Sequence, residues 1–246
     1  MQLDFFSSLF KKSLLKTEPK AEKKEVIKKV VKKSKPTTNE LFRKNISPHI
    51  PDAAIDEIQE YFLSKNDLSF RISNSRKTKL GDFRYDYQTK LCAISVNKDL
   101  NPYAFLITLL HEMAHYECWK AHKRKVKPHG EEWKHFYRLL AIPFLREDIF
   151  PKEIIATFTD YLQNPSASTC GDIELMKKLK LHNENDNPNK VMLENIAPKQ
   201  AFLISNKTMV KVEKKRKRYL CKDINSGKMY LVSSIAEVEV VQSKTN

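Results

Sequence analysis

The sequence predicts an α+β protein, because helix-like and strand-like patterns occupy separate stretches of the chain. Between about residues 51 and 162 the patterns are mainly helical, and two strand-like runs, LSFRIS and LCAISVN, lie among them. From about Val191 onward, apolar residues alternate as they do in β-strands. A hydrophobic content of 41% and an aromatic content of 10% are enough to form a packed core. We therefore expect a compact α+β domain followed by a small β-rich module.

Apolar spacing and end-capping residues mark the helices of the predicted domain. PDAAIDEIQEYFL places apolar residues at helical spacing behind Asp52, a candidate N-cap. The two strand-like runs follow, with a turn predicted between them at Gly81–Asp82. A long helix then begins at Pro102 with Asn101 as its candidate cap, and another covers about 131–140. Shorter helical pieces continue to the end of the domain.

Shifts in composition divide the chain into four parts. Residues 1–37 form a lysine-rich tail that contains too little apolar surface to order itself. Residues 38–162 form the α+β domain. Residues 163–190 form a linker, in which QNPSAST and NENDNPNK flank the short helical stretch IELMKKLK. Residues 191–243 form the β-rich module, with a strand, a turn at 225–227 and a second strand at its centre.

The charge of the chain favours a polyanionic partner. The 45 lysines and arginines outnumber the 30 acidic residues, so the formal net charge is +15. Charge of this sign and size attracts nucleic acid through long-range attraction and counterion release. The alternative is a basic protein whose charge has no such role. We therefore expect a nucleic-acid partner; charge alone does not distinguish DNA from RNA.

Several other classes are disfavoured by composition. The four glycines lie too far apart for a phosphate-binding loop, so P-loop and dinucleotide-binding folds are not expected. The four cysteines are scattered, as is typical of a reducing compartment, and form no four-thiolate zinc motif. No apolar run reaches the roughly 18 residues of a membrane span. We therefore expect a cytoplasmic protein without membrane contact. Association with the nucleoid is compatible with this location.

The stretch HEMAH, residues 111–115, predicts a catalytic metal site. Residues four apart lie on one face of a helix, so His111 and His115 can direct ring nitrogens to one point. Neutral imidazole suits Zn²⁺, and Glu112 is placed to act as a base on a water beside the metal. The preceding residues, 105–110, are strongly apolar and predict a buried helix, where unpartnered histidines would be costly. The alternative is a pair of ordinary helix-face histidines with Glu112 in solvent.

The third metal ligand has several candidates. His129 stands fourteen residues after His115 in PHGEEWK, where Pro128 and Gly130 predict a turn that brings the chain back over the first two ligands. This placement favours His129. The alternatives are the nearest downstream carboxylates and the other two nearby histidines: Glu131, Glu132, His122 and His135.

The segments LLHEMAHYECW and HGEEWKHF, with the upstream TKLGDFRY and LCAISVN, resemble the SprT-like domain shared by bacterial SprT proteins and the eukaryotic protease Spartan. The resemblance implies a compact zincin-like α+β domain with HExxH on a buried helix. It also implies one Zn²⁺ held by His111, His115 and His129, with Glu112 as catalytic base. For Spartan it further implies DNA-dependent cleavage of proteins, including proteins crosslinked to DNA.

The C-terminal module departs from the pattern of the family. SprT-like proteins often end in a zinc ribbon with paired cysteines, and RYLCKDINSGKMYLV is similar to the hairpin of such a ribbon. Cys221 alone stands where pairs are expected. We interpret residues 191–243 as a small β module, resembling a ribbon that has lost its cysteines, that folds without zinc.

Two groups of basic residues are candidates for nucleic-acid contact. One lies in the insert between the metal ligands, beside Trp119, whose ring can stack on an unpaired base; the other lies on a basic strand of the β module. These residues are Lys123, Arg124, Lys125 and Lys127, and Arg216 and Arg218. The alternatives are a solvated helix end, whose lysines suit the helix dipole, and a solvated edge strand.

The N-terminal residues predict a further partner. QLDFF resembles the short peptide by which bacterial proteins bind the replication sliding clamp, with Gln2, Leu3, Phe5 and Phe6 as contacts. An incidental apolar end is the alternative reading.

These observations together favour a zinc metalloprotease that acts on proteins on or near nucleic acid. The first alternative is a nucleic-acid-binding protein whose zinc is structural. The second is a zinc peptidase without a nucleic-acid role. The residue that stabilises the oxyanion stays open among three candidates on or near one strand: Arg84, Tyr85 and Tyr87.

Overall fold

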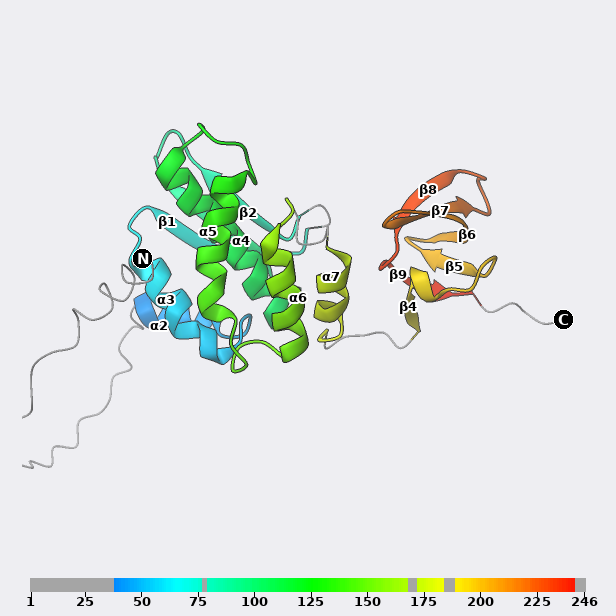
Figure 1. Ribbon diagram of the computed structural model, residues 1–246, viewed down its shortest axis with the longest axis horizontal. Coiled ribbons are helices and arrows are strands. Elements are labelled where there is room, and N and C mark those ends of the chain that lie inside the picture. Colours follow the sequence, from blue (N-terminus) through cyan, green and yellow to red (C-terminus); the bar gives the residue numbers. More distant parts are fainter. Residues whose placement is uncertain (1–37, 77–78, 168–171, 184–188, 242–246) are drawn as a thin grey trace, which may run out of the picture. The chain divides into compact units, whose positions relative to one another are not determined.

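A computed structural model describes residues 38–76, 79–167, 172–183 and 189–241 (Figure 1). It contains helices and two separate sheets, so the predicted α+β class is confirmed. The buried apolar residues form two clusters, one within residues 46–179 and one within residues 193–238. None of the described helices combines the length and the apolar content needed to cross a membrane. The tail predicted for residues 1–37 lies outside the described residues.

A three-stranded sheet lies beside the helix of the first cluster that carries the HEMAH stretch. Its strands are β1 (Leu68–Ser73), β2 (Gly81–Tyr85) and β3 (Cys92–Asn97), in the order β1-β3-β2. β3 pairs parallel with β1 and antiparallel with β2, which places β2 at an edge. The turn predicted at Gly81–Asp82 is wrong, because both residues begin β2 and the chain turns at 86–90 instead.

Helices surround this sheet and bury its apolar face. They are α2 (Thr38–Ile46), η1 (Asp52–Ala54), α3 (Ile55–Leu63), α4 (Pro102–His122), α5 (Glu131–Ala141), η2 (Ile142–Phe144), α6 (Lys152–Gln163) and α7 (Ile173–Lys180). The predicted cap of α4 is confirmed, since the Asn101 side chain accepts a hydrogen bond from the N–H of Ala104 at 2.9 Å. The predicted cap at Asp52 is wrong: it is the first residue of η1, and its side chain caps neither that turn nor α3.

Helix α4 is the central element of the first cluster. It packs against β2 and β3 and against α5, which runs alongside it (Figure 1). Residues 104–114 of α4 are buried without interruption, because this helix has apolar neighbours on both sides. A helix in that position can carry polar side chains only where they find partners, so the polar residues of HEMAH need a specific explanation.

The linker boundaries predicted at residues 163 and 190 stay a prediction, but the structure adds detail to this region. The helical stretch IELMKKLK forms α7, whose Leu175 and Leu179 are buried in the first cluster. The side-chain amide of Asn101 donates to the carbonyl oxygen of Leu179 at 2.8 Å, so α7 is tied to the start of α4.

The C-terminal strands form a six-stranded sheet with its own core. They are β4 (Lys190–Met192), β5 (Ala201–Ile204), β6 (Lys207–Lys215), β7 (Arg218–Asp223), β8 (Met229–Ser233) and β9 (Glu237–Val240), in the order β4-β9-β5-β6-β7-β8, with η4 (Leu193–Asn195) after β4. The predicted hairpin turn holds: Gly227 between β7 and β8 has a φ of 70°. Cys221 is a free thiol buried in this core, in a sheet larger than the hairpin of a zinc ribbon.

Candidate metal centre

Three histidines from two segments converge on one point. His111 and His115 lie one turn apart on α4, and their Nε2 atoms are 3.2 Å apart. His129 comes from the turn before α5, and its Nε2 atom is 2.9 Å from that of His115 and 3.3 Å from that of His111. The predicted ligand residues are therefore brought together, and they form the group that could hold a metal ion among the described residues.

The spacing and protonation of these rings fit a metal ion. Zinc–imidazole bonds of about 2.0–2.1 Å place the ligand nitrogens of a tetrahedral site roughly 3.3 Å apart. Burial lowers the pKa of all three imidazoles, to about 3 for His115, and the neighbouring rings lower the pKa of His111 and His115 further. Lowered pKa values favour the neutral form of these rings, and a neutral imidazole has one ring nitrogen whose lone pair can bind a metal ion.

A strained turn positions the third histidine, His129, beside the other two. His129 has a φ of 57°, in the left-handed region that side chains other than glycine seldom adopt. The N–H of Gly130 donates to the carbonyl oxygen of Lys127 at 3.0 Å, and Gly130 then caps α5. Strain of this kind persists where the surroundings hold it, and it is common at functional sites.

The other candidate ligands lie outside the cluster. Glu131 pairs with Lys134 at 2.7 Å. The rings of His122 and His135 both pack against Phe136, at centroid distances of 6.2 and 5.8 Å. Glu132 is likewise not part of the group that could hold a metal among the residues that the structure describes.

Glu112 lies next to the first histidine in a buried position. It is 7% exposed, and the backbone N–H of Phe83 on β2 donates a hydrogen bond to its carboxylate. Burial, followed by the negative charge of Asp82, raises the pKa of Glu112 to about 8, whereas Arg76 and Lys79 act in the opposite direction. Glu112, a carboxyl group whose pKa is raised by its surroundings, therefore lies beside the three imidazoles.

Residues 52–144, from η1 to η2, match the family model of the SprT-like family. This segment is similar to a SprT-like domain. The match includes the three histidines, Glu112 and the small sheet. No curated protein and no solved structure matches the chain.

One tryptophan packs against all three rings of the histidine cluster. Trp133 of α5 is fully buried, and its ring centroid lies 4.6, 5.3 and 4.7 Å from those of His111, His115 and His129. Sequence reasoning missed this residue. The signal was present, because Trp133, Tyr137 and Ala141 repeat at helical spacing and are the buried residues of α5.

The backbone of β2 passes so close to Glu112 that it has no room for a side chain. A Cβ atom at Gly81 would lie 2.7 Å from Cγ of Glu112 and 2.8 Å from the methyl carbon of Thr108. Glycine at the start of β2 therefore allows the strand to approach α4 and to hold the carboxylate. Sequence reasoning noticed Gly81 but interpreted it as a turn.

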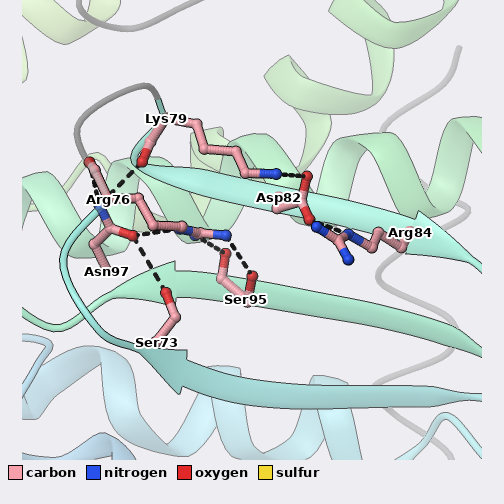
Figure 2. A network of polar contacts seen from close by, with 7 residues as sticks. All are labelled: Ser73, Arg76, Lys79, Asp82, Arg84, Ser95 and Asn97. Atoms are coloured by element: carbon pink, nitrogen blue, oxygen red, sulfur yellow. Dashed lines mark hydrogen bonds and ion pairs between the residues drawn. The ribbon is translucent and has the colours of Figure 1, made fainter.

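The charges near Glu112 are themselves held by a polar network across the small sheet (Figure 2). Asn97, which is 1% exposed, accepts from Nε of Arg76 at 2.7 Å and donates to the carbonyl oxygen of Lys79 at 3.0 Å. Nζ of Lys79 donates to Asp82 at 2.6 Å, and Arg84 also pairs with Asp82. Side chains that raise and lower the pKa of Glu112 are thus fixed in place.

The basic insert borders the histidine cluster. Lys123, Arg124 and Lys127 line a cavity that has His115 and His129 in its wall. The guanidinium of Arg124 lies 4.6 Å from the ring centroid of Tyr87, while Lys125 is exposed. The residues proposed for nucleic-acid contact in the insert are therefore close to the metal centre, although contact itself stays a prediction.

The remaining predicted residues lie away from the histidine cluster or outside the residues that the structure describes. Arg216 and Arg218 are exposed at the β6–β7 hairpin of the C-terminal sheet. Tyr85 and Tyr87 pack against Trp119 at 4.6 and 6.2 Å, and Arg84 pairs with Asp82, so none of the three is singled out as an oxyanion donor. Gln2, Leu3, Phe5 and Phe6 lie outside the described residues, and their binding to a sliding clamp stays a prediction.

Proposed function

We propose that this protein is a zinc-dependent metalloprotease that acts on proteins on or near nucleic acid. The observation that carries the proposal is the convergence of three neutral imidazoles within 3.3 Å of one another, with buried Glu112 beside the first. Three protein ligands leave a tetrahedral ion one open position, which is the arrangement of catalytic rather than structural zinc. The SprT-like match supports the same class of enzyme.

His111, His115 and His129 would hold the ion, with Trp133 beneath them to fix their rings. When bound, zinc supplies Lewis acidity toward a peptide carbonyl and a positive charge that favours the ionised form of Glu112. Glu112 then accepts a proton from the attacking water and passes it to the amine that leaves. The hydrogen bond from Phe83 keeps the carboxylate oriented for both transfers.

An extended substrate has a place to bind beside Glu112. β2 is at the edge of its sheet, so the outward side of its backbone offers N–H and C=O groups to a further strand. Pairing there would bring a peptide bond close to Glu112, because Gly81 and Phe83 of the same strand contact this side chain.

The charge of the chain and the position of the basic insert support a role for nucleic acid. The chain has a net charge of +15, and three cations of the insert border the cavity beside the histidines. DNA held along the insert would bring proteins bound or crosslinked to it within reach of the metal centre. The rival function is a zinc-containing nucleic-acid-binding protein that performs no catalysis. The edge strand β2, which lies beside Glu112 and has one side free for a further strand, favours the enzyme.

The test measures zinc content and proteolysis together, with and without DNA, for the wild type and for Glu112→Gln. We expect one zinc in both proteins, and cleavage of a basic DNA-bound protein that falls by about 100-fold or more in the variant. Zinc binding without cleavage by either protein would favour the non-catalytic rival. A wild type that binds no zinc would contradict both functions.

A salt titration tests the nucleic-acid part separately. The association constant K for duplex DNA should fall steeply with salt. Neutralising Lys123, Arg124 and Lys127 together should reduce the magnitude of the slope of log K against log salt by about 2.7, which is about 0.9 for each cation removed. Cleavage that is unaffected by DNA, with a flat salt dependence, would leave a zinc peptidase without a nucleic-acid role.

A further inference from the structure

An apolar cavity lies directly beside the histidine cluster. Its volume is about 380 Å³, and its wall includes His115 and His129. Aromatic and aliphatic side chains contribute much of the remaining wall, among them Phe83, Trp119, Val126 and Trp133. These residues come from β2, from the last turns of α4, from the insert and from α5, so the cavity is built by every segment that also builds the metal centre.

The cations of the insert give the cavity a charge preference. Lys123, Arg124 and Lys127 are exposed residues of the insert and also line the cavity. Nζ of Lys123 lies 5.7 Å from the ring of Trp119, so this charge stays close to the apolar wall. No carboxylate is among the lining residues, and a positively charged group entering the cavity would find no partner to compensate the repulsion.

We propose that this cavity receives one large apolar side chain of the protein substrate, next to the bond that is cut, and that it rejects lysine and arginine. The proposal rests on the proposed protease function and specifies its substrate. The cavity is adjacent to His115 and His129, so a side chain inside it belongs to a residue whose backbone lies at the metal centre. Apolar walls select by burial, and the cations add a penalty against basic side chains.

A nucleobase fits the same cavity less well. Bases carry amino donors and ring acceptors at their edges, and a buried base is read by side chains that match them. The wall contains no asparagine, glutamine, serine, threonine or acidic side chain among its lining residues, so amino groups of a base would find no side-chain oxygen to accept their hydrogen bonds there. An apolar side chain makes no such demand.

The experiment measures peptide binding separately from cleavage. Zinc-loaded full-length Glu112→Gln protein is titrated into dye-labelled peptides that share a glycine–alanine host sequence and differ at one central residue: phenylalanine, leucine, glycine or lysine. We expect the phenylalanine and leucine peptides to bind about tenfold tighter than the glycine peptide. The lysine peptide should bind no better than the glycine peptide. The wild type is then assayed for cleavage of the same set.

A variant that fills the cavity tests its position, with a control matched in size and charge. Val126→Trp adds bulk to a lining residue of the insert, whereas Ala121→Trp adds the same group at an exposed position of α4 that does not line the cavity. We expect Val126→Trp to remove the preference for phenylalanine over glycine. Ala121→Trp should keep it, and both variants should bind one zinc.

The outcomes separate this proposal from the protease function. A preference for phenylalanine in binding, without cleavage by the wild type, supports the cavity and contradicts the protease. Cleavage that is indifferent to the central residue, or that favours lysine, supports the protease and contradicts the cavity. A preference that survives Val126→Trp overturns the cavity as its cause. Binding of a single-stranded oligonucleotide that Val126→Trp abolishes, while the peptides stay indifferent, would assign the cavity to a nucleobase.

Discussion

At the scale of single residues, the position of Glu112 depends on Gly81, a residue that has no side chain. Gly81 lets β2 pass within contact distance of Cγ of Glu112 and of Thr108, and two residues later the N–H of Phe83 bonds the carboxylate. The strand thus provides space at one position and a hydrogen bond at another. Both depend on the same close approach of backbone to helix.

Gly81→Ala tests this dependence. The added methyl group must displace Glu112 or push β2 away from α4, so we expect cleavage to fall at least tenfold and the free energy of unfolding to fall by about 1–3 kcal/mol. The three histidines do not contact Gly81, so zinc content should remain at one per chain. Normal cleavage by a zinc-loaded Gly81→Ala protein would show that the approach of the strand is not needed.

The sequence predicts the ligands better than it predicts what supports them. His111 and His115 follow from helical periodicity, and His129 follows from the proline and glycine beside it. Gly81 could not be assigned in this way, because its role arises from a contact between residues 31 positions apart that no local pattern encodes. The predicted cap at Asp52 failed for a related reason: a 3₁₀ turn precedes the helix and shifts its start to Ile55.

At the scale of elements, helix α4 is fastened at both ends. At its start, the Asn101 side chain caps the helix and also donates to the carbonyl oxygen of Leu179 and to Oδ1 of Asn183, each at 2.8 Å. Toward its end, Asp67 accepts from the hydroxyl of Tyr116 at 2.7 Å and pairs with Lys120 at 2.8 Å. The segment with the metal ligands lies between these two anchors.

Two substitutions separate the roles of Asn101. Asn101→Ala removes both the cap and the link to α7, and we expect the free energy of unfolding to fall by about 1–2 kcal/mol. Asn101→Asp keeps a capping oxygen but loses the amide donor, so the loss should be smaller. Urea denaturation measures both. Equal losses would mean that the link to α7, rather than the cap, carries the stabilisation.

The pairing of Asp67 predicts a dependence on pH. Hydrogen bonds from Lys120 first, and from Tyr116, lower the pKa of Asp67 below its ordinary value of 3.8. The stabilisation is therefore present above about pH 3.8 and is lost as the pH falls through the lower pKa of the folded state. We expect Asp67→Asn to cost about 0.5–1 kcal/mol at pH 7, because both partners are partly exposed.

Urea denaturation of wild type and Asp67→Asn at pH 7 and near pH 3 checks this dependence. The difference between the two proteins should shrink in acid, because a protonated Asp67 resembles the asparagine that replaces it. A difference that is the same at both pH values would show that charge on Asp67 contributes nothing.

At the scale of the whole molecule, the described residues form two hydrophobic cores, and the candidate metal ligands lie within the stretch of chain that forms only one of them. The three histidines belong to the first core, which lies within residues 46–179. The second core, around Leu193, Phe202 and Cys221, contains no group able to hold a metal among the residues that are described. The proposed zinc would therefore bind within the stretch of chain that forms the first core, whereas the second core consists of buried apolar residues.

This difference predicts two thermal transitions, of which one responds to a chelator. Zinc at about a thousand times its Kd stabilises the fold that binds it by about 4 kcal/mol, which corresponds to roughly 15 °C for a domain of this size. We therefore expect calorimetry with excess zinc to show two transitions, and a chelator to lower the one that belongs to the first core by about this amount. In His115→Gln the chelator should have little effect on either transition. A single transition that moves as a whole would mean that the two cores unfold together, and a chelator that moves neither would mean that the histidines do not hold a metal.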